Sequence, residues 1–188
     1  MNNLDKYKKY DFTLNSYRPL RVVVTRPQIS MDSAAKKTSQ LIANHGGNPE
    51  NDNFWFMKEF GVSSSEELFQ NVLANQTREI EAYTEAEIKK SVTGQLALRL
   101  EQQIPEELIE DQLQQIDIPT NHEGEELGAA AQQSANEIGR QRAWQEAMRI
   151  AALLAYANHE GISTENGEED LLDKIYNDVK SKSKIRIL

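Results

Sequence analysis

Residues 63–103, SSSEELFQNVLANQTREIEAYTEAEIKKSVTGQLALRLEQQ, decide the fold of this 188-residue chain. Ser64 and Glu67 match a capping box, in which a serine oxygen accepts a hydrogen bond from the backbone N–H three residues later. From there to Gln103 only Gly94 interrupts the helical pattern, so the stretch predicts a single helix of roughly forty residues.

The apolar pattern changes along this predicted helix. Its first half places one set of apolar residues on a common face: Phe69, Val72, Leu73, Ile80 and Tyr83. Its second half carries a row at strict four-residue spacing: Ile88, Val92, Leu96 and Leu100. A four-residue row drifts around a helix, so we expect different neighbours to cover the two halves. Neither set has the heptad regularity of a coiled coil.

Further helices are predicted after this stretch. Pro105 ends the long helix and suits the first turn of a short one, PEELIEDQLQQI, residues 105–116. The segment DIPTNHEG at 117–124 predicts a turn. A second long helix is expected from about Glu125 to His159, since RAWQEAMRIAALLAYANH is rich in strong helix formers.

The ends of the chain add smaller elements. RPLRVVVTRP at 18–27 predicts a strand whose partner is either the segment around Phe12–Leu14 or a second chain. SAAKKTSQLIANH predicts a helix capped by Ser30 or Asp32. EEDLLDKIYNDV predicts a final helix. The expected fold is mainly α and elongated, with two very long helices, helical arms and a short N-terminal β segment.

We expect one helical domain over residues 20–180. Residues 1–19 would be an N-terminal tail or linker, and residues 181–188 a basic C-terminal tail. The net charge is −9, but residues 31–179 carry 11 basic and 28 acidic residues, or −17. Such a body is unsuited to nucleic acid. Lys6, Lys8 and Lys9, interleaved with Tyr7 and Tyr10, are better explained as part of a solvated tail than as a phosphate contact.

The sequence gives no reason to expect an enzyme. It contains no cysteine and no GxGxxG, GxxxxGK[ST], GxSxG or HExxH motif. His45, His122 and His159 stand at predicted helix ends or turns and favour structural roles. No catalytic, cofactor or metal site is predicted. Without an apolar stretch of about 20 residues or a secretory leader, the expectation is a cytoplasmic protein that does not contact a membrane.

Three segments carry a family resemblance. NPENDNFWFMKEFGVSSSEEL at 48–68 resembles the start of the C-terminal chaperone domain of trigger factor. LALRLEQQIPEELIEDQLQQ at 96–115 is similar to the end of that family's long helix. RAWQEAMRIAALLAYANHEGISTENGEEDLL at 142–172 is similar to its second arm helix. VVVTRPQISMDSAAKKTSQLIANHG at 22–46 also resembles the family's strand and helix before its prolyl-isomerase domain.

The departures from the family bear on function. Trigger factor would place its whole isomerase domain between Gly47 and Asn48, where this chain has no room for one. No glycine-rich, basic ribosome-docking loop is present. The resemblance therefore implies the substrate-holding body alone, as in the helical core of SurA-type chaperones, without isomerase activity.

An ATP-independent chaperone or holdase is the function that the resemblance implies. Its clients would be unfolded or nascent polypeptides, bound in an apolar cradle between helical arms. The candidate client-binding residues are Leu108, Ile109, Leu113 and Ile116 of the short helix, with Trp144, Met148 and Leu154 of the second long helix. Ordinary helix packing is the alternative for each.

The aromatic stretch NFWFMKEFG at 53–61 is expected to be structural. Phe54, Phe56 and Phe60 would pack the start of the long helix against other helices, rather than contact clients. A different function also remains open, an assembly module that binds one folded partner or forms a homodimer by edge pairing of the strand Arg21–Thr25.

Overall fold

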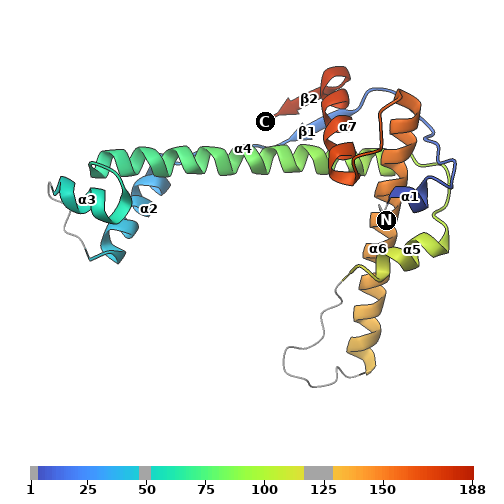
Figure 1. Ribbon diagram of the computed structural model, residues 1–188, viewed down its shortest axis with the longest axis horizontal. Coiled ribbons are helices and arrows are strands. Elements are labelled where there is room, and N and C mark those ends of the chain that lie inside the picture. Colours follow the sequence, from blue (N-terminus) through green and yellow to red (C-terminus); the bar gives the residue numbers. More distant parts are fainter. Residues whose placement is uncertain (1–3, 47–51, 117–128) are drawn as a thin grey trace. The chain divides into compact units, whose positions relative to one another are not determined.

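The computed structural model describes residues 4–46, 52–116 and 129–188 (Figure 1). The elements, in chain order, are α1 (Leu4–Tyr7), β1 (Arg21–Val24), α2 (Met31–Asn44), α3 (Asn53–Phe60), α4 (Ser65–Ala97), α5 (Glu106–Leu113), α6 (Ala129–Glu160), α7 (Glu168–Lys182) and β2 (Lys184–Ile187). The expected mainly α fold, with two long helices and a short β segment, is confirmed. The predicted turn at 117–124 and the start of the second long helix lie outside the described residues.

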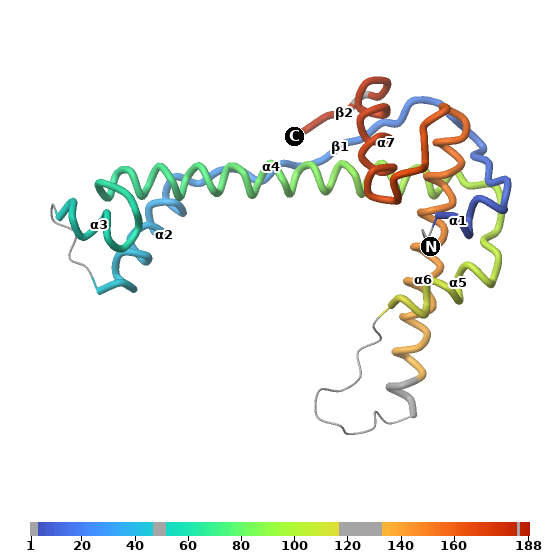
Figure 2. The backbone as a smooth tube through the Cα atoms, in the orientation of Figure 1, coloured from blue at the N-terminus to red at the C-terminus, as the bar shows by residue number. Residues whose placement is uncertain are grey.

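The chain divides into two compact units. The larger unit comprises Met1–Val22 and Lys89–Arg186, and the smaller unit comprises Val23–Ile88 with Ile187–Leu188. Figure 2 follows the backbone through both. The division falls within α4, between Ile88 and Lys89, which confirms that different neighbours cover the two halves of this helix.

Helix α4 has 33 residues and begins where the capping pattern predicts. Ser64 Oγ accepts from the Glu67 N–H at 3.2 Å, while Glu67 Oε2 accepts from the N–H and the hydroxyl of Ser63 at 2.7 and 2.6 Å. The helix ends at Ala97, short of the predicted Gln103. The chain leaves the helix there because its backbone pairs with the N-terminal segment: Asn15 donates to the Arg99 carbonyl at 2.7 Å.

Helix α6 forms the core of the larger unit. Every residue from Ile150 to Ala157 is buried. Successive residues of a helix point in directions about 100° apart, so continuous burial means that this segment is covered on all sides. Helices α1, α5 and α7 contact α6 (Figure 1). The small alanine side chains leave room for these neighbours.

The N-terminal segment differs from the predicted solvated tail. Leu4 and Tyr7 are fully buried, and Phe12 and Leu14 are nearly so. Lys6 pairs with Asp111 of α5 at 2.7 Å. Lys9 and Tyr10 contact Glu107 of the same helix. The N-terminal segment is therefore attached to α5, and its buried apolar residues belong to the core of the larger unit.

Within the chain, the partner of β1 is β2 and not the Phe12–Leu14 segment. The two strands are parallel, and hydrogen bonds extend the pairing beyond them: Leu188 donates to the Val24 carbonyl at 2.9 Å, and Arg26 donates to that of Leu188 at 2.9 Å. Residues 181–188, predicted to be a tail, instead contain the end of α7 and this strand. Sequence periodicity cannot identify a strand's partner so far along the chain.

In the smaller unit, one cluster of the core consists of four buried residues with two partly buried aromatic rings beside it: Ile42, Phe56, Val62, Leu68, Trp55 and Phe60. Ser30 caps α2, as predicted. Gly61 ends α3 with φ of +69°, a conformation that favours glycine. The structural role predicted for the aromatic stretch is confirmed for Phe56 and Phe60, but it is wrong for Phe54, which is 79% exposed.

Candidate functional site

Three of the predicted client-binding residues lie in the core of the larger unit. Leu108, Ile109 and Leu154 are buried, because α5 packs against α6 and the middle of α6 is enclosed. Their side chains are not available to a polypeptide in this conformation. Leu113 and Ile116 are half-buried on and just after α5. The predicted short-helix surface is thus mainly a packing surface, and its buried residues do not belong to the candidate site.

The other two predicted residues lie on the accessible part of α6. Trp144 is 42% exposed, and Met148 is half-buried and lines a groove of about 670 Å3. The opposite side of this groove is formed by the last turns of α4, including Gly94 and Ala97, and by Leu98 directly after the helix. We call this feature the α4–α6 groove. It lies entirely within the larger unit.

Leu98 is the apolar residue of the groove that sequence reasoning missed. It directly follows α4 and is 81% exposed, whereas Val92 and Leu96 in the last turns of that helix are fully buried. A signal was present in the sequence, since Leu98 falls outside the four-residue row from Ile88 to Leu100. A large apolar side chain off the buried row of a helix points toward solvent or toward a ligand.

The polar side of the groove is fixed by an ion-pair network. Arg149 Nε donates to Glu146 Oε2 at 2.9 Å, and the same guanidinium also binds Glu168. Burial by itself would lower the pKa of Arg149, but the hydrogen bonds to these two carboxylates outweigh it and raise that pKa above its ordinary value. Arg149 therefore stays charged and holds this side of the groove in place. Arg142 also lines the groove and forms no ion pair with any described residue.

A second cavity, of about 570 Å3, lies at another place in the larger unit. Basic side chains from the N-terminal segment, the residues after α4 and the end of α7 line it. Among the described residues that line this cavity, none is acidic. Its composition is thus the opposite of the acidic composition of the chain as a whole.

The described residues contain no group of three or more histidine, aspartate or glutamate side chains able to bind a metal ion. His45 and His159 stand at helix ends as predicted. His45 Nδ1 lies 2.9 Å from the Leu41 carbonyl oxygen, and the ring of His159 stacks on Tyr17 with centroids 3.6 Å apart. His122 lies outside the described residues. None of the described helices combines the length and the apolar character needed to cross a membrane.

Comparison with known proteins found no family model, no curated protein and no solved structure that matches the chain. The resemblance to trigger factor therefore stays a prediction, and the function must be argued from the geometry of the two cavities.

Proposed function

We propose that the protein is an ATP-independent holdase that binds unfolded polypeptide segments in the α4–α6 groove. The observation that supports this most strongly is the 81% exposure of Leu98 in an open groove that Met148 also lines. Covering a leucine side chain contributes about 1.5–3 kcal/mol, so an exposed one is a good anchor for a partner's apolar residues.

The groove suits clients of varied sequence. Methionine is unbranched and flexible, so Met148 can adapt to side chains of different shapes. Gly94 and Ala97 are small and leave space for a client residue. Arg142 and Gln145 add donors at the rim for backbone carbonyls of an extended segment. This combination favours weak binding of many unfolded segments over tight binding of one.

The proposed holding of clients does not require a nucleotide. It contains no phosphate-binding GxxxxGK[ST] loop, and release of a client would depend on the weakness of each contact. The resemblance of residues 22–46, 48–68, 96–115 and 142–172 to the trigger factor chaperone domain adds support from the sequence. The isomerase domain of that family has no counterpart here, so no isomerase activity is proposed.

Suppression of aggregation tests the proposal. An unrelated denatured enzyme is diluted into buffer with stoichiometric protein and no nucleotide, and light scattering is followed. Leu98→Ser and Met148→Ser should each weaken suppression several-fold, because they remove apolar surface from the groove. Phe54→Ser is the matched control, since Phe54 is 79% exposed but belongs to the smaller unit, and it should suppress like the wild type. Absence of suppression at every ratio would refute a holdase.

One observation favours a second candidate, the assembly module. Val23, Ile187 and Leu188, in or just after the two strands, are 57%, 51% and 57% exposed. Apolar residues on a short two-stranded sheet suit edge pairing with a second copy or with another folded protein. Sedimentation velocity over a hundredfold range of concentration would reveal such a homodimer, and Val23→Thr should weaken it.

A further inference from the structure

The second cavity, which we call the arginine cavity, collects an unusual set of side chains. Its polar lining consists of Ser16, Arg18, Arg21, Gln95, Arg99 and Lys182. All of them belong to the larger unit. They come from the segment before β1 and its first residue, from the end of α4 and the residues after it, and from the end of α7. Separate parts of the chain thus bring positive charge to one place in a protein of net charge −9.

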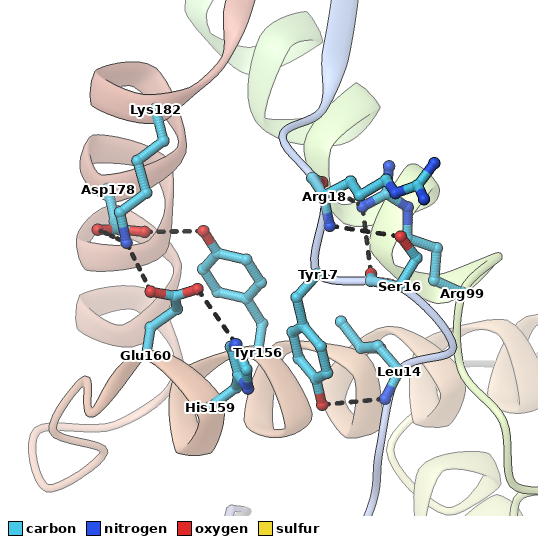
Figure 3. Close-up of polar contacts among 10 residues, drawn as sticks. All are labelled: Leu14, Ser16, Tyr17, Arg18, Arg99, Tyr156, His159, Glu160, Asp178 and Lys182. Atoms are coloured by element: carbon cyan, nitrogen blue, oxygen red, sulfur yellow. Dashed lines mark hydrogen bonds and ion pairs between the residues drawn. The ribbon is translucent and has the colours of Figure 1, made fainter.

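The arginines differ from the lysine in their partners. Lys182 is already neutralised, since its Nζ lies 2.6 Å from Glu160 and 2.8 Å from Asp178 (Figure 3). Arg18, Arg21 and Arg99 form no ion pair with any of the residues that the structure describes. The excess positive charge of the cavity therefore comes from three guanidinium groups, whose mutual repulsion an anion would relieve.

Arg99 is held in a defined position. Its Nη1 donates to the carbonyl oxygens of Ser16 at 3.2 Å and of Arg18 at 2.6 Å, as Figure 3 shows. Nη2 and Nε of Arg99 donate to no acceptor among the described residues, so they remain for a ligand. Ser16 Oγ accepts from the Arg18 N–H at 3.3 Å, which leaves its own hydroxyl proton to donate.

The backbone that carries the other two arginines is also fixed. Gln95 Nε2 donates to the Arg21 carbonyl at 3.0 Å, and the Leu20 N–H donates to Ser183 Oγ at 3.0 Å. Pro19 restricts the backbone between Arg18 and Arg21. Since the Arg18 carbonyl accepts from Arg99, the segment is held at both ends. It therefore loses little further freedom when it binds a ligand, which favours affinity.

We propose that the arginine cavity is a binding site for a compact polyanion carrying phosphate or carboxylate groups. Guanidinium groups present paired N–H donors that match both kinds of oxyanion. The volume of about 570 Å3 is that of a site for a small molecule. Each anionic group would bind one or two arginines, with the Ser16 hydroxyl as an additional donor. This site is separate from the α4–α6 groove and does not depend on the holdase proposal.

Isothermal titration calorimetry with inorganic tripolyphosphate and with citrate tests the proposal, at an ionic strength held constant with sodium chloride. Wild type should bind at least one of them saturably with a stoichiometry of one. Arg18→Gln and Arg21→Gln each remove a charge from an exposed side chain and should weaken binding about fivefold to tenfold or more. Arg78→Gln is the matched control, an exposed arginine of the smaller unit, and should bind like the wild type.

The two ligands distinguish the sources of the anion. Tighter binding of tripolyphosphate identifies a phosphate site, and tighter binding of citrate identifies a carboxylate site. Arg99 is not substituted, because its hydrogen bonds also position the backbone. Absence of saturable binding of both ligands, or an equal loss of affinity in Arg78→Gln, would overturn the proposal, since either result would mean that only non-specific screening occurs.

Discussion

The two units fill their cores in different ways. In the larger unit, α6 is enclosed by its neighbours and uses alanines between larger residues, as in the buried run from Ile150 to Ala157. In the smaller unit, α2, α3 and the start of α4 meet through a few large side chains, with Phe56 buried between Trp55 and Phe60. A helix that is surrounded on all sides needs small side chains so that neighbouring helices can approach it. Where few helices meet, as in the smaller unit, large side chains are needed to fill the space between them.

This difference explains why so much apolar surface is concentrated in residues 53–61. A small core buries a small share of its unfolded surface, so each aromatic ring provides a larger fraction of its stability. We therefore expect the smaller unit to open at a lower free energy than the larger one. Three substitutions, in order of expected effect, test this comparison.

The largest effect is expected from Phe56→Ala. Removing a fully buried phenylalanine costs about 3–5 kcal/mol, and Phe56 is 2% exposed. Hydrogen exchange should show loss of protection in α2, α3 and the first half of α4, with protection retained in α6. Phe54→Ala on the same helix is the control, since that ring is 79% exposed and its loss should change stability little. Equal loss of protection in α6 would show that the chain unfolds as a single cooperative unit.

A smaller effect is expected in the larger unit from Tyr7→Phe. The buried Tyr7 hydroxyl accepts from Gln112 Nε2 at 3.0 Å, and Gln112 is also buried. Leaving this amide without a partner should cost about 1–3 kcal/mol at pH 7. Denaturant unfolding measures this loss of unfolding free energy, and Tyr83→Phe is the control because the Tyr83 side chain is half-exposed. If Tyr7→Phe lowers the unfolding free energy no more than Tyr83→Phe does, the Tyr7–Gln112 hydrogen bond does not stabilise the core.

The same tyrosine makes a pH prediction. Burial raises the pKa of Tyr7 to about 12, from an ordinary value of 10.0. The folded state thus favours the neutral phenol, and its contribution is complete below pH 10 and is lost as the pH rises toward 12. Since Tyr7→Phe lacks this ionisation, the difference in unfolding free energy between wild type and variant should narrow across that range. A difference in unfolding free energy that stays constant from pH 10 to pH 12 would contradict the burial of the Tyr7 hydroxyl.

The smallest effect is expected from Glu67→Gln in the smaller unit. The hydroxyl and the backbone N–H of Ser63 lower the pKa of Glu67 below its ordinary value of 4.5. The ionised carboxylate therefore stabilises the folded state above pH 4.5, and this contribution is lost as the pH falls through the lowered pKa. In thermal melts the difference from wild type should be largest at pH 7 and should shrink as the pH is lowered below 4.5, whereas the exposed Glu79→Gln should show no difference at either end of this range. A difference in melting temperature that stays constant as the pH falls would assign the effect to packing.

Local chemistry made much of the fold predictable. Ser30 and Ser64 cap their helices as expected, because a cap depends on residues within one turn. The partner of β1 and the early end of α4 were not predictable, since both depend on segments far away in the sequence. The candidate surface was only partly predictable. Met148 was expected to line it, but burial of Leu108 and exposure of Leu98 depend on which helix faces meet, and a single sequence does not specify this.

The pairing of β1 with β2 can form only late in synthesis, because the two strands lie at opposite ends of the chain. The bond between Leu20 and Ser183 joins residues 163 positions apart. At about 5–20 residues per second, a ribosome needs roughly 8–30 s to make the intervening chain. During this time the valine-rich strand has been synthesised without its partner, and unpaired strands of this kind readily join other chains. A pause in translation between the two strands should therefore increase misassembly more than a pause before β1.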